Sequence, residues 1–173
     1  MIRAWRPWWR LLPAALALAP TGAGSRAAEP LPASEATAPV DVADSIAPFL
    51  RRVERALDRR DLRLVMATYA DTGLVISSAF GHMTESRTAI RADLERFFLG
   101  TVALQFNFAT PRVHLLAPDA AALAARYTAS VTPRDAPPYT AHGVWTGVVA
   151  VRGGRLVILQ EHQSQVSSDE TAS

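Results

Sequence analysis

The sequence predicts an α+β domain whose helices come first and cover one face of a curved antiparallel sheet. Apolar residues recur at helical spacing between residues 44 and 100, whereas residues 101–166 contain four strand-like segments. Turn signals separate these segments at residues 118–119, 133–138 and 153–154. Helices followed by a meander of antiparallel strands is the order of an α+β domain.

Residues 1–28 have the pattern of a secretory signal peptide. A basic start is followed by the short apolar block 11–20 and by small residues that lead to a cleavage site near Ala28. The basic residues of the start are Arg3, Arg6 and Arg10. The apolar block is too short to span a bilayer, although a retained N-terminal anchor is the alternative. We expect a secreted or periplasmic bacterial protein without a stable membrane anchor after processing.

Removal of this leader changes the charge of the chain. Four of the 18 basic residues, the last of them Arg26, lie in the leader, and none of the 16 acidic residues does. The remaining 14 arginines against 16 acids give a slightly acidic protein, which argues against nucleic acid as a partner. The chain has no cysteine, so disulfides and thiolate chemistry are excluded.

The predicted domain covers residues 45–166, between a Pro- and Ala-rich flexible linker at 29–44 and a disordered tail at 167–173. The first helix has an apolar face and begins at a cap formed by Asp44 or Ser45. This face consists of Ile46, Phe49, Leu50, Val53 and Leu57.

Two further helices and the strands follow. Asp61 is placed to cap a short helix over residues 62–70, and residues 73–83 form a short strand and a turn. Thr84 is the expected cap of a third helix, which ends at Gly100. The four long strands are expected within residues 101–118, 120–133, 139–152 and 154–166.

Three segments resemble the nuclear transport factor 2-like, or SnoaL-like, superfamily. They are "RRDLRLVMATYADTGLVIS", "TESRTAIRADLERFF" and "HGVWTGVVAVRGGRLVILQEHQS". Ile158, His162 and Ser164 match the usual last strand of this family, whereas Leu156 replaces an aromatic residue and Ser86 replaces a frequent glycine. The resemblance implies a cone in which three N-terminal helices pack on a curved, mostly antiparallel sheet.

One enzyme branch of this superfamily, ketosteroid isomerase, does not fit. The resemblance places Ser77 at its general base, Val53 at its oxyanion-hole tyrosine and Thr146 at its protonated aspartate. Neither serine nor valine provides the required carboxylate or hydroxyl donor. We therefore expect no steroid isomerisation by that constellation.

The resemblance also implies which side chains face the interior of the cone. These are Ser77, Thr146, Leu159, Glu161 and Gln163, to which strand alternation adds His142 and Val144. His162 and Ser164 are expected on the opposite face. An uncovered patch on that face, formed with Trp145, Leu156 and Ile158, predicts a homodimer.

Glu161 is the principal candidate for chemistry, because a carboxylate in a partly apolar cavity can exchange protons near neutral pH. His142 is its candidate partner across neighbouring strands. The alternatives for Glu161 are a salt bridge to an arginine such as Arg126 or exposure at the mouth of the cone, and the alternative for His142 is a hydrogen-bonded, purely structural role. Tyr69, at the end of the second helix, is a candidate ligand contact, although such a hydroxyl often only closes a turn.

The sequence therefore predicts a binding domain for a small apolar or amphipathic molecule, with Ser77, Thr146, Leu159, Gln163 and Tyr69 as ligand contacts. The alternative is an isomerase, hydrolase or lyase that uses Glu161 and His142 as an acid–base pair. The spacing of the histidines matches no metal motif, and no phosphate loop or nucleophile elbow is present, so neither a metal nor a cofactor is expected.

Overall fold

The computed structural model describes residues 41–73, 75–79 and 82–166. The predicted signal peptide, most of the predicted linker and the predicted tail lie outside these residues. Three helices and seven strands follow one another along the chain: α1 (Val42–Asp58), α2 (Leu62–Met66), β1 (Ile76–Ala79), β2 (His82–Thr84), α3 (Arg87–Leu99), β3 (Thr101–Phe108), β4 (Arg112–Ala117), β5 (Ala120–Pro133), β6 (Tyr139–Arg152) and β7 (Arg155–Val166).

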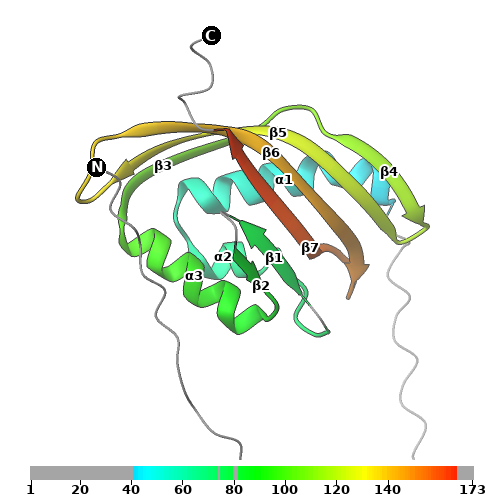
Figure 1. Cartoon of the computed structure of the whole chain (residues 1–173). Helices are drawn as coiled ribbons and strands as arrows, with labels where there is room; N and C mark the ends of the chain where they lie inside the picture. Colours follow the sequence, from blue (N-terminus) through cyan, green and yellow to red (C-terminus); the bar gives the residue numbers. More distant parts are fainter. Residues whose placement is uncertain (1–40, 74, 80–81, 167–173) are drawn as a thin grey trace, which may run out of the picture. The chain divides into compact units, whose positions relative to one another are not determined.

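All seven strands form one curved sheet, and the helices lie on one side of it (Figure 1). The strand order is β2-β1-β7-β6-β5-β3, and β4 pairs with the first part of β5. Every pairing is antiparallel except the one between β1 and β7, which is parallel. The expected α+β cone, with three helices on a mostly antiparallel sheet, is confirmed.

Two of the three expected helix caps are wrong. Asp41 rather than Asp44 or Ser45 caps α1, since its backbone is extended and its carboxylate accepts from the Asp44 amide at 3.2 Å. Ser86 caps α3 in the same way, because Thr84 still belongs to β2. Asp61 caps α2 as predicted. Each observed cap lies directly before the first helical residue, where its oxygen reaches an unpaired amide.

The helix α1 covers the sheet and also accepts hydrogen bonds from backbone amides of the edge strand β3. Its buried face consists of Val42, Ile46, Phe49, Leu50, Val53 and Ala56. The carboxylates of Asp58 and Glu54 accept hydrogen bonds from the β3 amides of Phe106 and Phe108, both at 2.7 Å. These bonds occupy amides that an edge strand would otherwise leave free for another chain.

No described helix is long and apolar enough to cross a membrane.

A bulge in β7 determines which of its side chains face the helices. Val148 pairs with Gln160 and Val149 pairs with Ile158, so Leu159 is an extra residue on β7. The side chains before the bulge therefore shift by one position relative to those after it. As a result, Ile158 and Glu161 both face the helices, although they are three positions apart in the sequence.

The predicted apolar patch on the uncovered face is wrong for the same reason. Leu156 and Ile158 are 3% and 1% exposed and belong to the core with the residues of α1. Trp145 is 2% exposed and lies in the same core. His162 and Ser164 are exposed, as expected. The homodimer therefore stays a prediction, without the apolar surface that supported it.

Candidate functional site

Glu161 lies on the inner face of the sheet, the face that packs against the helices. It stands opposite Gly147 of β6 on one side and beside Ser77 of β1 on the other. It is only 5% exposed, and it is the one acidic residue in the buried part of the described chain. A carboxylate at such a position requires hydrogen-bond partners, since an unpaired buried charge is very costly.

Three neutral donors meet this carboxylate. The Tyr69 hydroxyl and the Ser77 hydroxyl donate to Oε1, the latter at 2.9 Å. The indole N–H of Trp145 donates to Oε2 at 2.8 Å. Among the described residues, no arginine forms an ion pair with Glu161. The alternative salt bridge to Arg126 is not formed, because that exposed side chain lies on the outer face of β5.

Gly147 leaves the space that lets the Trp145 indole reach Glu161. A Cβ atom at Gly147 would lie 2.6 Å from Cη2 and 2.7 Å from Cζ2 of the indole. These distances are well below van der Waals contact, so only glycine permits the ring to lie over this strand. Because Gly147 is also the cross-strand partner of Glu161, the indole N–H is directed at the carboxylate.

Tyr69 is held in place through its backbone. It forms an isolated parallel bridge with Ile158 of β7. On either side of it, the Ile158 amide donates to the Thr68 carbonyl at 2.7 Å, and the Ala70 amide donates to the Ile158 carbonyl at 3.0 Å. The chain after α2 thus runs beside the bulged part of β7, which places the tyrosine ring next to Glu161.

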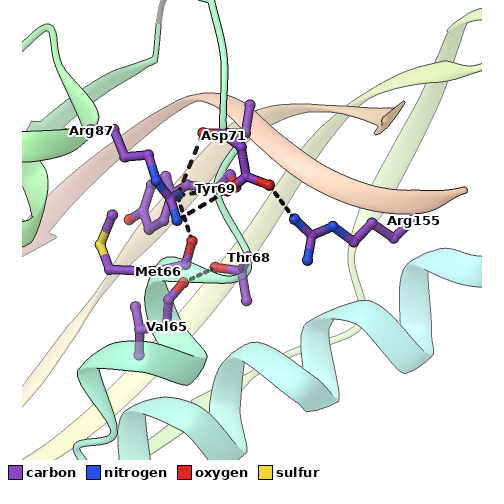
Figure 2. A network of polar contacts seen from close by, with 8 residues as sticks. Val65, Met66, Thr68, Tyr69, Asp71, Arg87 and Arg155 are labelled. Atoms are coloured by element: carbon purple, nitrogen blue, oxygen red, sulfur yellow. Dashed lines mark hydrogen bonds and ion pairs between the residues drawn. The ribbon is translucent and has the colours of Figure 1, made fainter. Parts of the chain in front are cut away.

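Arg87 of α3 holds the same segment from the other side (Figure 2). Its Nη1 donates to the carbonyls of Met66, Tyr69 and Ala70 at 2.6, 3.3 and 3.5 Å. Its Nη2 lies 3.1 Å from the carboxylate of Asp71, which also pairs with Arg155 of β7. One guanidinium therefore binds three backbone carbonyls, at the end of α2 and just after it, together with the Asp71 carboxylate.

The electrostatics of the site keep Tyr69 protonated. Burial raises the pKa of the Tyr69 hydroxyl well above its usual value, and the charge of Glu161 and the hydrogen bond to it act in the same direction. The pKa of Tyr127 is also raised, first by burial and then by Tyr139. Tyr69 is consequently a permanent donor to Glu161 at neutral pH.

A row of aromatic rings extends from Trp145 along the inner face. Phe108 packs against Trp145 with 5.4 Å between ring centroids, and Phe106 packs against Phe108 at 4.9 Å. Tyr127 stacks on Phe106 at 5.0 Å. The inner face therefore combines one carboxylate and its donors with a row of aromatic side chains.

The structure brings three of the predicted site residues together, namely Glu161, Ser77 and Tyr69. Gln163 lies on the same face, opposite Trp145, and is partly exposed. Leu159 is the half-buried bulge residue rather than a regular inward position.

Three expected inward positions are wrong. Thr146, Val144 and His142 alternate with Trp145 and Gly147 and so point to the outer face. His142 is exposed, and its ring lies 3.3 Å from the Thr128 hydroxyl. It cannot reach Glu161 through the sheet, so the predicted acid–base pair is not formed.

Trp145 is the site residue that sequence reasoning missed, since it was expected on the outer face. The available signal was the pattern Gly143-x-Trp145-x-Gly147, in which two glycines flank the indole on the same face of the strand. A Cβ atom at Gly143 would collide with the Ser164 carbonyl oxygen and would lie 2.8 Å from the Tyr127 ring, whereas one at Gly147 would meet the Trp145 ring. Glycines at positions where a close neighbour leaves no room for a side chain indicate a tightly packed face of the strand.

Other features of the described chain do not add to this site. No three His, Asp or Glu side chains within it gather so as to hold a metal ion. One open recess of about 290 Å³ lies between the α1–α2 turn and the end of α3, and another of about 310 Å³ lies between α1 and the β6–β7 turn. Glu161 lines neither of them.

Comparison with known families identifies the domain. Residues 46–168 match the model of the SnoaL-like domain. The chain belongs to this family. No curated protein matches the sequence significantly. The SnoaL-like domain is thus a member of the nuclear transport factor 2-like superfamily, as the resemblance implied.

Solved structures share the fold of this SnoaL-like domain. A putative calcium/calmodulin dependent protein kinase II association domain from Xanthomonas campestris is 23% identical, with a TM-score of 0.63 over 81% of this chain and 94% of that chain. A nuclear transport factor 2-like protein of unknown function from Shewanella oneidensis is 24% identical, with a TM-score of 0.57 over 70% of this chain and 98% of the other.

A putative scytalone dehydratase from Novosphingobium aromaticivorans is 12% identical, with a TM-score of 0.66 over 72% of this chain and 84% of that chain. At such identities these likenesses establish the fold alone. The SnoaL-like domain is therefore a cone of the type that supports ligand binding or catalysis.

Proposed function

We propose that this SnoaL-like domain binds a small amphipathic molecule on the inner face of its cone, with Glu161 as the polar anchor. The observation that carries the proposal is the buried Glu161 carboxylate, which three neutral donors hold in place and no described cation neutralises. From Trp145 a row of aromatic rings extends along the inner face. A mostly apolar surface with a few convergent polar groups is typical of small-molecule sites.

Stability alone does not account for this arrangement. An apolar side chain of similar size at position 161 would avoid the desolvation of a charge, and such replacements are often neutral or stabilising. The chain instead commits Tyr69, Ser77 and Trp145 to a single carboxylate. A role in recognition explains why all four polar side chains meet on the inner face.

Binding has better support than acid–base catalysis. With His142 on the outer face, Tyr69 is the only titratable group among the described residues that is in contact with Glu161. The raised pKa of Tyr69 makes it a poor proton acceptor or donor to a substrate near neutral pH. Both oxygens of Glu161 also already accept hydrogen bonds.

The experiment is a screen of small amphipathic molecules by ligand-observed nuclear magnetic resonance. We expect hits that bind the protein, lose binding in Glu161→Gln and keep it in His162→Gln. The second variant is the matched control, because His162 is adjacent in sequence but exposed on the outer face. If Glu161→Gln does not fold, Ser77→Ala tests the site in its place, because this variant removes one hydrogen-bond donor and keeps the charge of Glu161. Hits that are indifferent to all three substitutions would disprove the proposal.

We also propose that the domain acts outside the cytoplasm, on the basis of the leader pattern in residues 1–28. The intact mass of protein recovered from the periplasm of expressing cells tests this. A chain that begins near Ala28 is the expected result, and one that still begins at Met1 contradicts it.

A further inference from the structure

We infer that the open edge of β4 pairs with β4 of a second copy of this chain, so that two sheets join through the backbone of Val113 and Leu115. This edge lies apart from the Glu161 site, because β6 and β5 separate it from β7. Three properties of β4 support the pairing: its free backbone groups, its half-exposed apolar side chains and its two-fold symmetric pattern.

The two margins of the sheet differ in how they are protected. At one margin β2 is only three residues long, and so short a strand offers little to pair with. The other margin consists of β3 and β4, which lie one after the other along the same side of β5 (Figure 1). On β3, Asp58 and Glu54 of α1 occupy the outward amides of Phe106 and Phe108. Among the described residues, no side chain protects β4 in this way.

Hydrogen bonding along β5 shows which of its backbone groups point toward this margin. The Arg126 carbonyl accepts from the Ala109 amide, so the backbone groups of Arg126 point to the side on which β3 and β4 lie. Successive residues of a strand direct these groups to opposite sides. The backbone groups of Ala124 and Ala122 therefore point to the same side as those of Arg126, where β4 lies.

The register of β4 then shows which of its own groups are free. The residues opposite Ala124 and Ala122 are Arg112 and His114, and their N–H and C=O groups bond to β5. By the same alternation, the N–H and C=O groups of Val113 and Leu115 point away from β5. They offer an added strand two successive positions for backbone hydrogen bonds.

The open edge also carries apolar side chains. Val113 and Leu115 stand opposite Leu123 and Ala121, which belong to the core, so both side chains lie on the inner face of the sheet. They are nevertheless 44% and 54% exposed. A strand added to β4 would cover these side chains as well as bond to their backbone.

The pattern of β4 is complementary to itself. Antiparallel pairing about a two-fold axis at His114 places Val113 opposite the partner's Leu115 and Leu115 opposite the partner's Val113. Each such pair exchanges both backbone hydrogen bonds, and the apolar side chains of both copies meet on the inner face. Pro111 and Pro118 flank β4, so the pairing ends at similar places in both copies. A second copy thus supplies the matching length, backbone pattern and apolar residues together.

The charges on β4 permit this arrangement. Arg112 is its only arginine, and β4 has no acidic residue. The two copies of Arg112 would lie four residues apart along the joined strands, or roughly 13 Å, which exceeds the screening length of about 10 Å at about 0.1 M salt. At the axis the two copies of His114 stand side by side on the outer face, where uncharged imidazoles pack without repulsion.

Sedimentation equilibrium at about pH 8 tests the pairing on the chain as it is recovered from expressing cells. Over concentrations from about 10 μM to about 2 mM we expect a monomer–dimer equilibrium with a dissociation constant of about 50 μM to 1 mM, because a contact of one short strand is much smaller than a stable interface. Val113→Pro should weaken the dimer at least about tenfold, since proline removes an outward N–H and leaves the bonds to β5 in place. Met83→Asp is the matched control: Met83 is 64% exposed on the opposite margin, and its substitution should change nothing.

A second variant keeps the test decisive if Val113→Pro does not fold. Leu115→Asp places a charge among the apolar side chains of the joined inner face and should also weaken the dimer at least about tenfold. A chain that is monomeric at the highest concentration overturns the inference. So does a dimer that is unaffected by Leu115→Asp, since it must form through another surface. If the chain stays monomeric while an unrelated extended peptide shifts the amide resonances of Val113 and Leu115, the edge serves another partner and the second copy is ruled out.

Discussion

Replacement of Gly147 by alanine should be strongly destabilising, although this substitution adds a single methyl group. Alanine in the interior of a strand is ordinarily favoured over glycine by about 0.5–1 kcal/mol, because glycine loses more backbone freedom on folding. At Gly147 the new Cβ would lie 2.6 Å from the Trp145 ring and 3.1 Å from the Gln160 carbonyl oxygen. The ring must move, and its movement separates the indole N–H from Glu161.

The magnitude follows from these two effects. Overpacking in a core typically costs about 1–3 kcal/mol. Loss of a hydrogen bond to a buried charged group costs about 1.5–3 kcal/mol. The free energy of unfolding should therefore fall by about 2.5–6 kcal/mol in Gly147→Ala, a large share of the stability of an ordinary domain.

Urea denaturation followed by circular dichroism measures this change. Gly100→Ala is the matched control, since its Cβ meets nothing closer than 3.6 Å and its φ of −81° suits alanine. A stabilising change of up to about 1 kcal/mol is expected there. Trp145→Phe removes the two crowded ring atoms, so Gly147→Ala should cost at least about 1 kcal/mol less in that background. A Gly147→Ala variant as stable as the original protein, or a cost unchanged by Trp145→Phe, would refute the reasoning.

Three further predictions concern the groups around the site. The pKa of Tyr69 is higher in the folded chain than the value of about 10 in an unfolded one, so stability is complete below that pH and falls as the pH rises above it. Alkaline unfolding curves of Tyr69→Phe should show a weaker pH dependence, and an unchanged dependence would contradict this. Arg87→Lys should lower the free energy of unfolding by about 1–2 kcal/mol, because an ammonium cannot bind Asp71 and three carbonyls together, whereas Arg91→Lys on the exposed side of α3 should change it little. Equal effects of Arg87→Lys and Arg91→Lys on stability would contradict the role of Arg87 in holding this segment. Ser86→Ala should cost about 1 kcal/mol by denaturation, and more than Thr84→Ala, if Ser86 is the helix cap.

Much of the fold could be predicted from the sequence, because local patterns determine it. The apolar spacing of Ile46, Phe49 and Val53 predicted α1, and Asp61 was the correct cap of α2. The caps of α1 and α3 were placed a few residues away from Asp41 and Ser86, since Asp44 and Ser45 in the first turn of α1 and Thr84 before α3 are also residues of the types that cap helices. Only backbone conformation decides which of these oxygens reaches an amide.

The candidate site, like the fold, could be predicted from the sequence only in part. The family resemblance indicated that Glu161 and Ser77 face the interior of the cone, and Tyr69 was a candidate ligand contact from its place at the end of the second helix. It did not indicate how they meet. Oε1 of Glu161 receives donors that lie 84 and 92 residues earlier in the chain, and such contacts exist only after β1 and the segment behind α2 have paired with β7.

Only the tertiary structure decided which side chains of β6 and β7 face the core and which face outward. Regular alternation back from Glu161 would put Leu156 and Ile158 on the outer face, but the extra residue Leu159 turns both into the core. On the neighbouring strand, pairing with Glu161 sends Gly147 and therefore Trp145 inward and His142 outward. The side-chain period of a strand is two, so a shift of one residue exchanges the faces. The sequence determined that Glu161 is buried, and the pairing of β6 with β7 determined that its partner is Trp145.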